Sequence, residues 1–266
     1  MRNIIFLTFA DKRGIPMLKR IKREVLEMNF FTSVKICSDN NLRRQYKKQN
    51  KQRFKLRGYG YWIWKSYLVK ETLTKMNSND ILVYADAGCT INKNGIQRLK
   101  DYLHIVDKTH CGILTFQHDS APHLEKEYTK GDLFAFTNTN SQSSIYNTPQ
   151  LWAGSFIIRK CELSSSFVEE WYDLCHNHFD LITDQPSRTP NFPCFIEHRH
   201  DQSAFSVLLK PYFPAIISDK ETYTTGNFNE DLQSFPIWAT RKREYINKEC
   251  FLKRIIRKII NLCLVK

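Results

Sequence analysis

The sequence predicts an α/β fold in which helices cover both faces of a largely parallel central sheet. Short, nearly unbroken apolar runs alternate along the chain with longer amphipathic segments. This alternation is typical of parallel strands that are buried on both faces. The 266 residues are 42% hydrophobic, so the chain can form a substantial core and is not a disordered protein.

The strands are expected where apolar runs end in polar loops. The first run, NIIFLTF, ends in a loop from Ala10 to Gly14, and ILVYAD follows the turn residues Asn79 and Asp80. The expected strands are 3–9, 33–38, 81–86, 111–116, 151–160 and 213–218.

The helices are expected where apolar residues recur at helical spacing. Pro16 can open the first helix, and a serine caps the helix that starts at 164. The expected helices are 15–28, 58–76, 94–108, 123–134, 164–179 and 200–210.

The net charge of +13 is unevenly distributed. Residues 1–75 hold 19 Lys/Arg against 5 Asp/Glu, residues 76–240 hold 12 against 20, and residues 241–266 hold 9 against 2. A non-catalytic nucleic-acid-binding protein, with 41–57 as its basic helix, is one alternative that this charge allows. The acidic middle and the lack of a nucleic-acid-binding motif count against it, so no nucleic-acid partner is expected.

The C-terminal segment FLKRIIRKIINLCLVK (251–266) alternates apolar pairs with Lys/Arg pairs. On a helix this pattern makes one apolar and one cationic face, as in helices that lie on an anionic membrane. The alternative is a terminal helix that packs on the core with its charges in water. We therefore divide the chain into a domain at 1–245 and a basic amphipathic tail at 246–266.

Ligands of such sheets bind beyond the carboxyl ends of the strands. Asp86 directly follows the strand ILVYA, where a carboxylate can hold a divalent cation or bond a sugar hydroxyl. The alternative is an ordinary turn aspartate that caps the next helix. Asp201 and Gln202 begin a helix, where the alternative for Asp201 is an N-cap. Lys65 stands in an aromatic run and needs an anionic or acceptor partner if it is buried.

Several enzyme classes lack their sequence signatures here. The chain has no GxSxG, no P-loop and no GxGxxG after its first strand, which argues against hydrolase triads, P-loop kinases and Rossmann dehydrogenases. A nucleotidyltransferase would need a glycine-rich basic loop at that place. The stretch from Asp11 to Gly14 is only a faint version of that loop.

Four stretches, in order, carry a resemblance to a known family. They are the first strand with its loop at 8–11, RGYGYWIWKSYL (57–68), VYADAG (83–88), and LWAGSFIIRK (151–160) followed by HDQSAF (200–205). Together they resemble bacterial nucleotide-sugar glycosyltransferases of the GT-A fold, related to glycosyltransferase families 8 and 32. The resemblance covers roughly residues 3–245 and implies a GT-A-like, Rossmann-like sheet.

The resemblance also implies roles for individual residues. Asp201 and Gln202 would face the reacting sugar as catalytic residues. The donor-binding residues would be Thr8, Ala10, Asp11, Lys65, Asp86, Ala87, Gly88, Trp152, Ala153, Gly154, Arg241 and Arg243. The late basic cluster Arg241, Lys242 and Arg243 is also well placed in the sequence to stabilise the leaving diphosphate.

Two departures from the family pattern concern the metal. The second acid of the DXD motif is Gly88 here, and the late metal-ligand histidine has no clear match. Either Asp86 and the diphosphate hold Mn²⁺ or Mg²⁺ with several waters, or cationic side chains take the place of the ion. The sequence slightly favours the metal.

The implied reaction is hexosyl transfer from a nucleotide-diphosphate sugar, expected to be a UDP-sugar, to a glycan or lipid-linked glycan hydroxyl. The product would be lipopolysaccharide, O-antigen or capsule. A retaining enzyme would place Gln202 beneath the anomeric carbon, whereas an inverting one would use Asp201 as its base. The expected location is the cytoplasm, with 251–266 on the anionic surface of the inner membrane.

Overall fold

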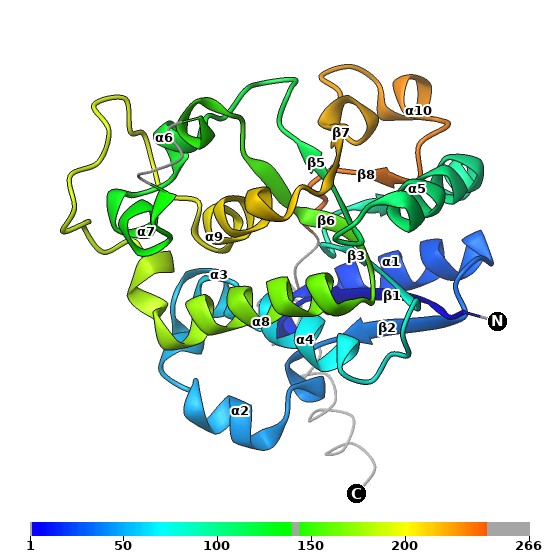
Figure 1. Cartoon of the computed structure of the whole chain (residues 1–266). Coiled ribbons are helices and arrows are strands. Elements are labelled where there is room, and N and C mark those ends of the chain that lie inside the picture. The colour runs from blue at the N-terminus through cyan, green and yellow to red at the C-terminus, as the bar shows by residue number, and fades with distance from the viewer. Residues whose placement is uncertain (1, 140–143, 244–266) are drawn as a thin grey trace, which may run out of the picture.

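The computed structural model describes residues 2–139 and 144–243. Its centre is a six-stranded sheet in the order β2-β1-β3-β6-β5-β7 (Figure 1). These strands are β1 (Ile4–Phe9), β2 (Ser33–Cys37), β3 (Ile81–Ala85), β5 (Ile113–Gln117), β6 (Leu151–Arg159) and β7 (Ala215–Ser218). β6 pairs antiparallel with both β3 and β5, whereas the other pairs are parallel. The predicted α/β fold with a mostly parallel sheet is confirmed.

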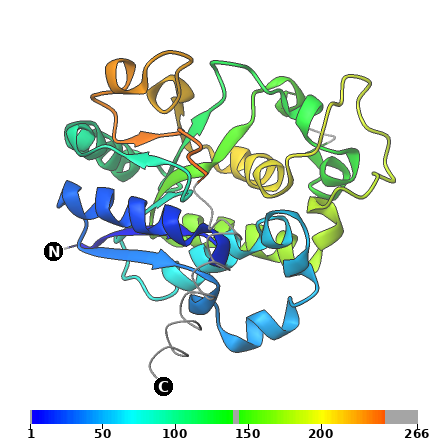
Figure 2. The same cartoon turned by 180° about the vertical axis from the view of Figure 1, so that it is seen from behind.

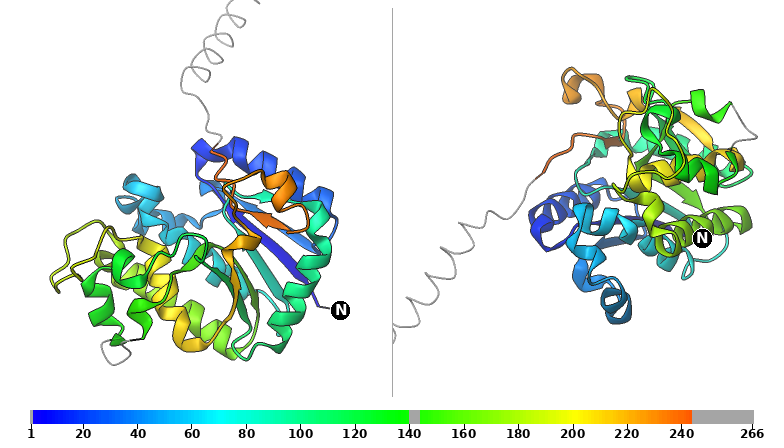
Figure 3. Two further views of the ribbon diagram at one scale, coloured as in Figure 1. Left: turned by 90° about the horizontal axis from the view of Figure 1, so that it is seen from above. Right: turned by 90° about the vertical axis from the view of Figure 1, so that its left-hand side faces the viewer.

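Helices cover both faces of this sheet, as the views from behind and from above show (Figures 2 and 3). The long helices are α1 (Ile15–Met28), α4 (Ile63–Leu73), α5 (Ile96–Lys108), α8 (Glu162–Asn177) and α9 (His200–Leu209). The short ones are α2 (Arg44–Gln49), α3 (Arg57–Tyr61), α6 (Glu125–Tyr128), α7 (Gly131–Phe136) and α10 (Phe228–Asp231).

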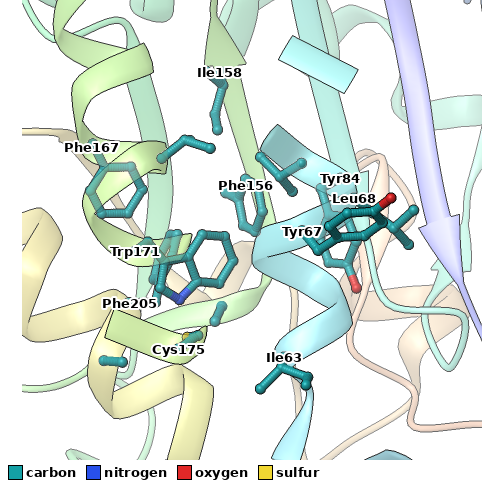
Figure 4. Close-up of a cluster of buried hydrophobic side chains, with 14 of the residues drawn as sticks. Ile63, Tyr67, Leu68, Tyr84, Phe156, Ile158, Phe167, Trp171, Cys175 and Phe205 are labelled. Atoms are coloured by element: carbon teal, nitrogen blue, oxygen red, sulfur yellow. The ribbon is translucent and has the colours of Figure 1, made fainter. Parts of the chain in front are cut away.

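One face of the sheet packs against α4, α8 and α9 through large aromatic side chains (Figure 4). Phe156 of β6 stacks on Phe205 of α9, with ring centroids 5.1 Å apart, and Trp171 of α8 meets Phe205 edge-on at 5.1 Å. All three side chains are buried. Their burial supplies much of the apolar free energy that holds α8 and α9 to the sheet.

The opposite face packs against α1 and α5. Alternate residues of the same strands, such as Phe6 and Val83, point to this side, as the period of two in a strand requires. Ile21 and Val25 of α1 and Tyr102 of α5 bury against them. The apolar stripe predicted for 15–28 is therefore the face that covers the sheet.

The direction of β6 matters for function. Because β6 runs antiparallel to β3, its first residues lie beside the carboxyl end of β3, with Ser155 paired to Ala85. The backbone N–H of Asp86 donates to the Gly154 carbonyl at 2.8 Å. The start of β6 and the end of β3 thus share the edge of the sheet where ligands bind in this fold.

The structure differs from the sequence-based expectation in several elements. The helix expected at 58–76 is right-handed only from Ile63, and the one expected at 123–134 is two short helices, α6 and α7. A second, two-stranded sheet of β4 (Thr90–Ile91) and β8 (Ile237–Trp238) was not expected. The tail at 246–266, with its expected helix at 251–266, lies outside the described residues.

No described helix combines the length and apolar character that crossing a membrane requires.

Replacing Phe205 by Ala should lower the free energy of unfolding by about 3–5 kcal/mol, because it removes the ring between β6 and α8. The matched control is Phe213→Ala, since the Phe213 side chain is 85% exposed and its loss should cost no more than about 0.5 kcal/mol. Urea unfolding of both variants measures the difference. Equal losses would contradict the core described here.

Candidate functional site

A cavity of about 720 Å³ opens at the carboxyl edge of β1 and β3 and is bordered by α4, α9 and the segment after β8. Most of the residues singled out from the sequence line it: Ala10, Asp11, Lys65, Asp86, Ala87, Gly88, Trp152, Gly154, Asp201, Gln202, Arg241 and Arg243. Two do not. Thr8 is buried within β1, and Ala153 is 1% exposed and contributes its carbonyl oxygen beneath the cavity.

Lys65 forms the floor of the cavity. Its side chain is 4% exposed, and its Nζ lies 2.8 Å from Asp201 Oδ2 and 3.5 Å from Asp86 Oδ1. It also donates to the Ala153 carbonyl at 3.2 Å. The sequence predicted that a buried Lys65 would need an anionic or acceptor partner. The fold provides three: the carboxylates of Asp86 and Asp201 and the carbonyl of Ala153.

The charges of this cluster depend on each other. Burial disfavours the charged form of Lys65, but Asp201 and Asp86 outweigh it and raise the Lys65 pKa above its ordinary value. Burial also raises the pKa of Asp201 to about 6, against the opposing effect of Lys65. The cavity floor thus holds an ammonium group and a carboxylate that titrates near neutrality, a combination typical of functional sites.

Asp86 is the exposed member of the cluster. Its side chain is 39% exposed, and its Oδ1 accepts a hydrogen bond from the Tyr84 hydroxyl at 2.6 Å. Tyr84 itself is fully buried, so it fixes the carboxylate from beneath. Asp86 therefore presents its other oxygen to the cavity, where it can accept from a ligand hydroxyl.

Gln202 is held by a polar network that the sequence did not reveal. Its Nε2 donates to Gln150 Oε1 at 3.0 Å. Gln150 is fully buried and donates in turn to Glu125 at 3.2 Å and Ser203 at 3.1 Å. Because Gln150 uses its own donors on these groups, its oxygen faces Gln202 and sets which way the Gln202 amide points.

The start of β6 forms one wall. A Cβ on Gly154 would come 2.3 Å from Trp152 Nε1, so the indole lies directly over the glycine. Glycine at 154 is required for this close approach. Trp152 and Gly154 thereby give the cavity a flat aromatic surface next to Asp86.

A left-handed turn forms the wall that precedes Lys65. Five consecutive residues, Gly58 to Trp62, have φ between +50° and +89°. Three of them carry side chains, at a cost of about 1–2 kcal/mol each. The Trp64 indole donates to the Gly58 carbonyl at 3.1 Å, and the Tyr61 hydroxyl donates to Asp184 at 3.0 Å. Strain of this kind is retained mainly at functional sites.

The turn presents aromatic rings at two ends of the cavity. Tyr59 stacks on Phe54 at 4.3 Å and lies 6.1 Å from Phe9, beside the end of β1. Trp62 stacks on His200 at 5.5 Å, beside Asp201. Asp11, at the β1 end, caps the following turn and pairs with Arg13 at 2.6 Å.

The metal cage that the resemblance implies does not fit these residues. Among residues 2–139 and 144–243, no three His, Cys, Asp or Glu side chains converge as metal ligands. Asp86 shares its Oδ1 with the Tyr84 hydroxyl and faces the ammonium group of Lys65. Gly88 offers no side-chain ligand at the second DXD position.

Sequence reasoning missed several residues of the cavity wall. These are Arg57, Tyr59, Trp62, Glu197, Arg199 and His200. Two lie in the left-handed turn, which no periodicity reveals. His198 and His200, from the stretch EHRHDQ, line the cavity and contact each other's rings, and they form no metal cluster with other described residues.

The sequence matches no protein-family model and no curated protein. Its fold is similar to a glycosyltransferase involved in glycosylating the major capsid of PBCV-1, at 11% identity and a TM-score of 0.50, covering 89% of this chain and 91% of that one. It is also similar to the glycosyltransferase GlyE of Streptococcus pneumoniae TIGR4, at 10% identity and a TM-score of 0.51, covering 93% of this chain and 55% of that one. The chain has the GT-A-like fold of these glycosyltransferases.

The raised pKa of Asp201 predicts a specific pH dependence of stability. Between roughly pH 4, where an unfolded Asp titrates, and the folded-state value of about 6, the folded protein binds more protons than the unfolded chain. The contribution of Asp201 to the free energy of unfolding should therefore grow as the pH falls through this window. It should grow by at most about 1.4 kcal/mol per pH unit.

Urea unfolding at pH 7.5, 6.0 and 5.0 measures this effect as the difference between wild type and Asp201→Asn, in which the group cannot titrate. Effects of titratable groups that do not contact Asp201 largely cancel in that difference, and Lys65 is expected to stay charged throughout this pH range because Asp86 still faces it. We expect the free energy of unfolding of the wild type, minus that of the variant, to rise as the pH falls. If this difference stays constant or falls, Asp201 is not a buried carboxyl with a raised pKa.

Proposed function

We propose that the chain is a glycosyltransferase that moves a hexosyl group from a nucleotide-diphosphate sugar, with UDP as the nucleotide, to a hydroxyl of a cell-surface glycan. The observation that carries the proposal is the Lys65–Asp86–Asp201 cluster at the floor of the cavity. The cluster provides one cation and two carboxylates at the edge of the sheet where nucleotides bind in α/β folds. The fold shared with glycosyltransferases supports it.

The cavity has the features that a nucleotide sugar requires along its length. Tyr59 offers a partly exposed ring at the β1 end, beside the buried Phe9, where a nucleoside base can stack. Asp86 and the carboxylate of Asp201 can accept hydrogen bonds from sugar hydroxyls near Lys65. Arg241 and Arg243 line the same cavity as Gly88, where their positive charge can stabilise the leaving diphosphate.

The arrangement favours the retaining course. Asp201 Oδ2 is engaged by Lys65 at 2.8 Å, so this oxygen is not free to take a proton from an acceptor. Gln202 stands beside it with its amide orientation fixed by Gln150. A polar, uncharged group held in this way can support positive charge that develops at the anomeric carbon. The anomer of the product, read by NMR, tests this assignment.

The alternative of a nucleic-acid-binding protein is less well supported. Two arginines of the basic segment 41–57 contribute to the fold. Arg43 pairs with Glu71 at 2.6 Å, and Arg53 packs over the ring of Phe179 at 4.3 Å while donating to the His176 carbonyl. Other cations of the segment, such as Arg44, Lys48 and Lys51, are exposed, so the case against this alternative rests on the acidic middle of the chain and on the fold shared with glycosyltransferases.

A thermal-shift screen against UDP-, GDP-, CMP- and dTDP-sugars tests the proposal. We expect one nucleotide class to raise Tm, because a ligand that binds the folded protein stabilises it by mass action. The same screen on Asp201→Asn should show a weaker shift, and sugar transfer should fall by about a hundredfold or more. Asp173→Asn, at an exposed carboxylate on α8, is the matched control and should behave like wild type.

Stabilisation by none of these sugars, or normal transfer by Asp201→Asn, would contradict the proposal. Steeply salt-dependent binding of DNA or RNA in place of nucleotide sugars would favour the nucleic-acid alternative.

We further propose, from the sequence pattern of 251–266, that the tail binds an anionic membrane surface such as the inner face of the bacterial cytoplasmic membrane. On a helix, its alternating apolar and Lys/Arg pairs would give one apolar face for the lipid and one cationic face that attracts acidic lipids. The full chain should co-sediment with vesicles that contain phosphatidylglycerol and much less with pure phosphatidylcholine. Replacing Lys253, Arg254, Arg257 and Lys258 by Gln should abolish the preference. Equal binding to both vesicle types by the wild type would contradict it.

A further inference from the structure

Gly88 stands at the second position of the acidic motif although the local geometry does not demand glycine. Its φ is not among the positive values found at Gly58, Gly60 and Gly112. A Cβ at 88 would meet its nearest neighbour, Arg241 Cα, at 3.7 Å, which is ordinary contact. A larger residue could therefore stand here without backbone strain. Compared with the acidic residue of the DXD motif, Gly88 lacks a side chain that could bind a metal.

The segment after β8 lies against Gly88 at this point. The backbone N–H of Lys242 donates to the Gly88 carbonyl at 2.9 Å, and Thr240 Oγ1 donates to the same oxygen at 3.2 Å. Thr240 is also hydrogen-bonded to Thr90 at 2.9 Å, next to the pairing of β4 with β8. Residues 240–242 are thus fixed to the loop that follows Asp86.

This attachment brings guanidinium groups into the cavity. Arg241 and Arg243 both line it, whereas Lys242, between them, does not. Among the described residues, no carboxylate lies within ion-pair distance of Arg241 or Arg243. The other cations of the wall are paired: Arg13 with Asp11, Lys65 with Asp86 and Asp201, Arg57 with Asp184, and Arg199 with Glu197. The cavity therefore has unneutralised positive charge at the place where the metal cage is missing.

We propose that Arg241 and Arg243, and not a metal ion held by the protein, bind and neutralise the diphosphate of the donor. This inference rests on the proposed function and concerns the same cavity. Guanidinium groups bind phosphate oxygens through paired N–H donors. They stabilise the charge that develops on the leaving diphosphate, as a divalent cation would.

Isothermal titration of the full chain with UDP, GDP and dTDP tests the proposal, first with EDTA and then with Mn²⁺. One of these nucleoside diphosphates should bind, and its affinity in EDTA should equal its affinity in Mn²⁺ within about threefold. Arg241→Ala/Arg243→Ala should lose about tenfold or more in diphosphate affinity. The same double variant should lose much less affinity for the corresponding nucleoside monophosphate, which lacks the second phosphate.

Lys242→Ala is the matched control, because it removes a neighbouring positive charge while keeping the backbone bond to Gly88. It should bind the diphosphate like wild type. Circular dichroism and Tm of each variant show whether it is folded, and the single variants Arg241→Gln and Arg243→Gln replace the double variant if it is not.

The outcomes separate this inference from the proposed function. Binding that appears only with Mn²⁺ would overturn the inference while leaving the glycosyltransferase proposal intact. An equal loss in Lys242→Ala and in the arginine variants would also overturn it, since general charge would then explain the affinity. Failure of every nucleoside diphosphate to bind in either buffer would refute both proposals.

Discussion

The ammonium group of Lys65 is the interaction on which the rest of this site depends. It joins α4, which carries the lysine, to Asp86 after β3, to Ala153 in β6 and to Asp201 in α9. Removing one partner from a buried ion pair typically costs about 3–5 kcal/mol, because the other charge is left without compensation. The elements around the cavity are therefore held in register by one charge cluster, and any movement of α4 against α9 would expose or unpair it.

Local strain surrounds this cluster on both sides. The left-handed turn from Gly58 to Trp62 ends three residues before Lys65, and His200, with φ +54°, directly precedes Asp201. The rings of Trp62 and His200 stack on each other at 5.5 Å, so the two strained segments support each other. We interpret the strain as the cost of directing Lys65 and Asp201 towards the same point at the start of two different helices.

The sequence predicted the sheet and its main helices because their apolar periodicity records which faces are buried. It also singled out Asp86 and Lys65, since a carboxylate at a strand end and a lysine among aromatic residues need a physical explanation, and the resemblance added Asp201 at a helix start. It could not predict that Gly58–Trp62 is left-handed, because the glycines and aromatics of this stretch also fit the start of an ordinary helix. It could not predict Gln150 either, since one glutamine before a strand carries no signal until its partners are known. The pairing of β4 with β8 joins residues far apart in sequence, and two-residue strands leave no pattern.

That pairing determines where positive charge enters the cavity. The basic residues from 241 onward could have been only the start of a membrane-binding tail. Their first members are instead held in place by Thr90, Gly88 and the β4–β8 ladder. Charge supplied by side chains that follow a two-residue strand depends on the order of that strand, whereas a metal ion depends on its ligands. Weakening the β4–β8 pairing should therefore weaken diphosphate binding, because it loosens the segment that carries Arg241 and Arg243. The proposed diphosphate site and the small second sheet are in this sense one structural unit.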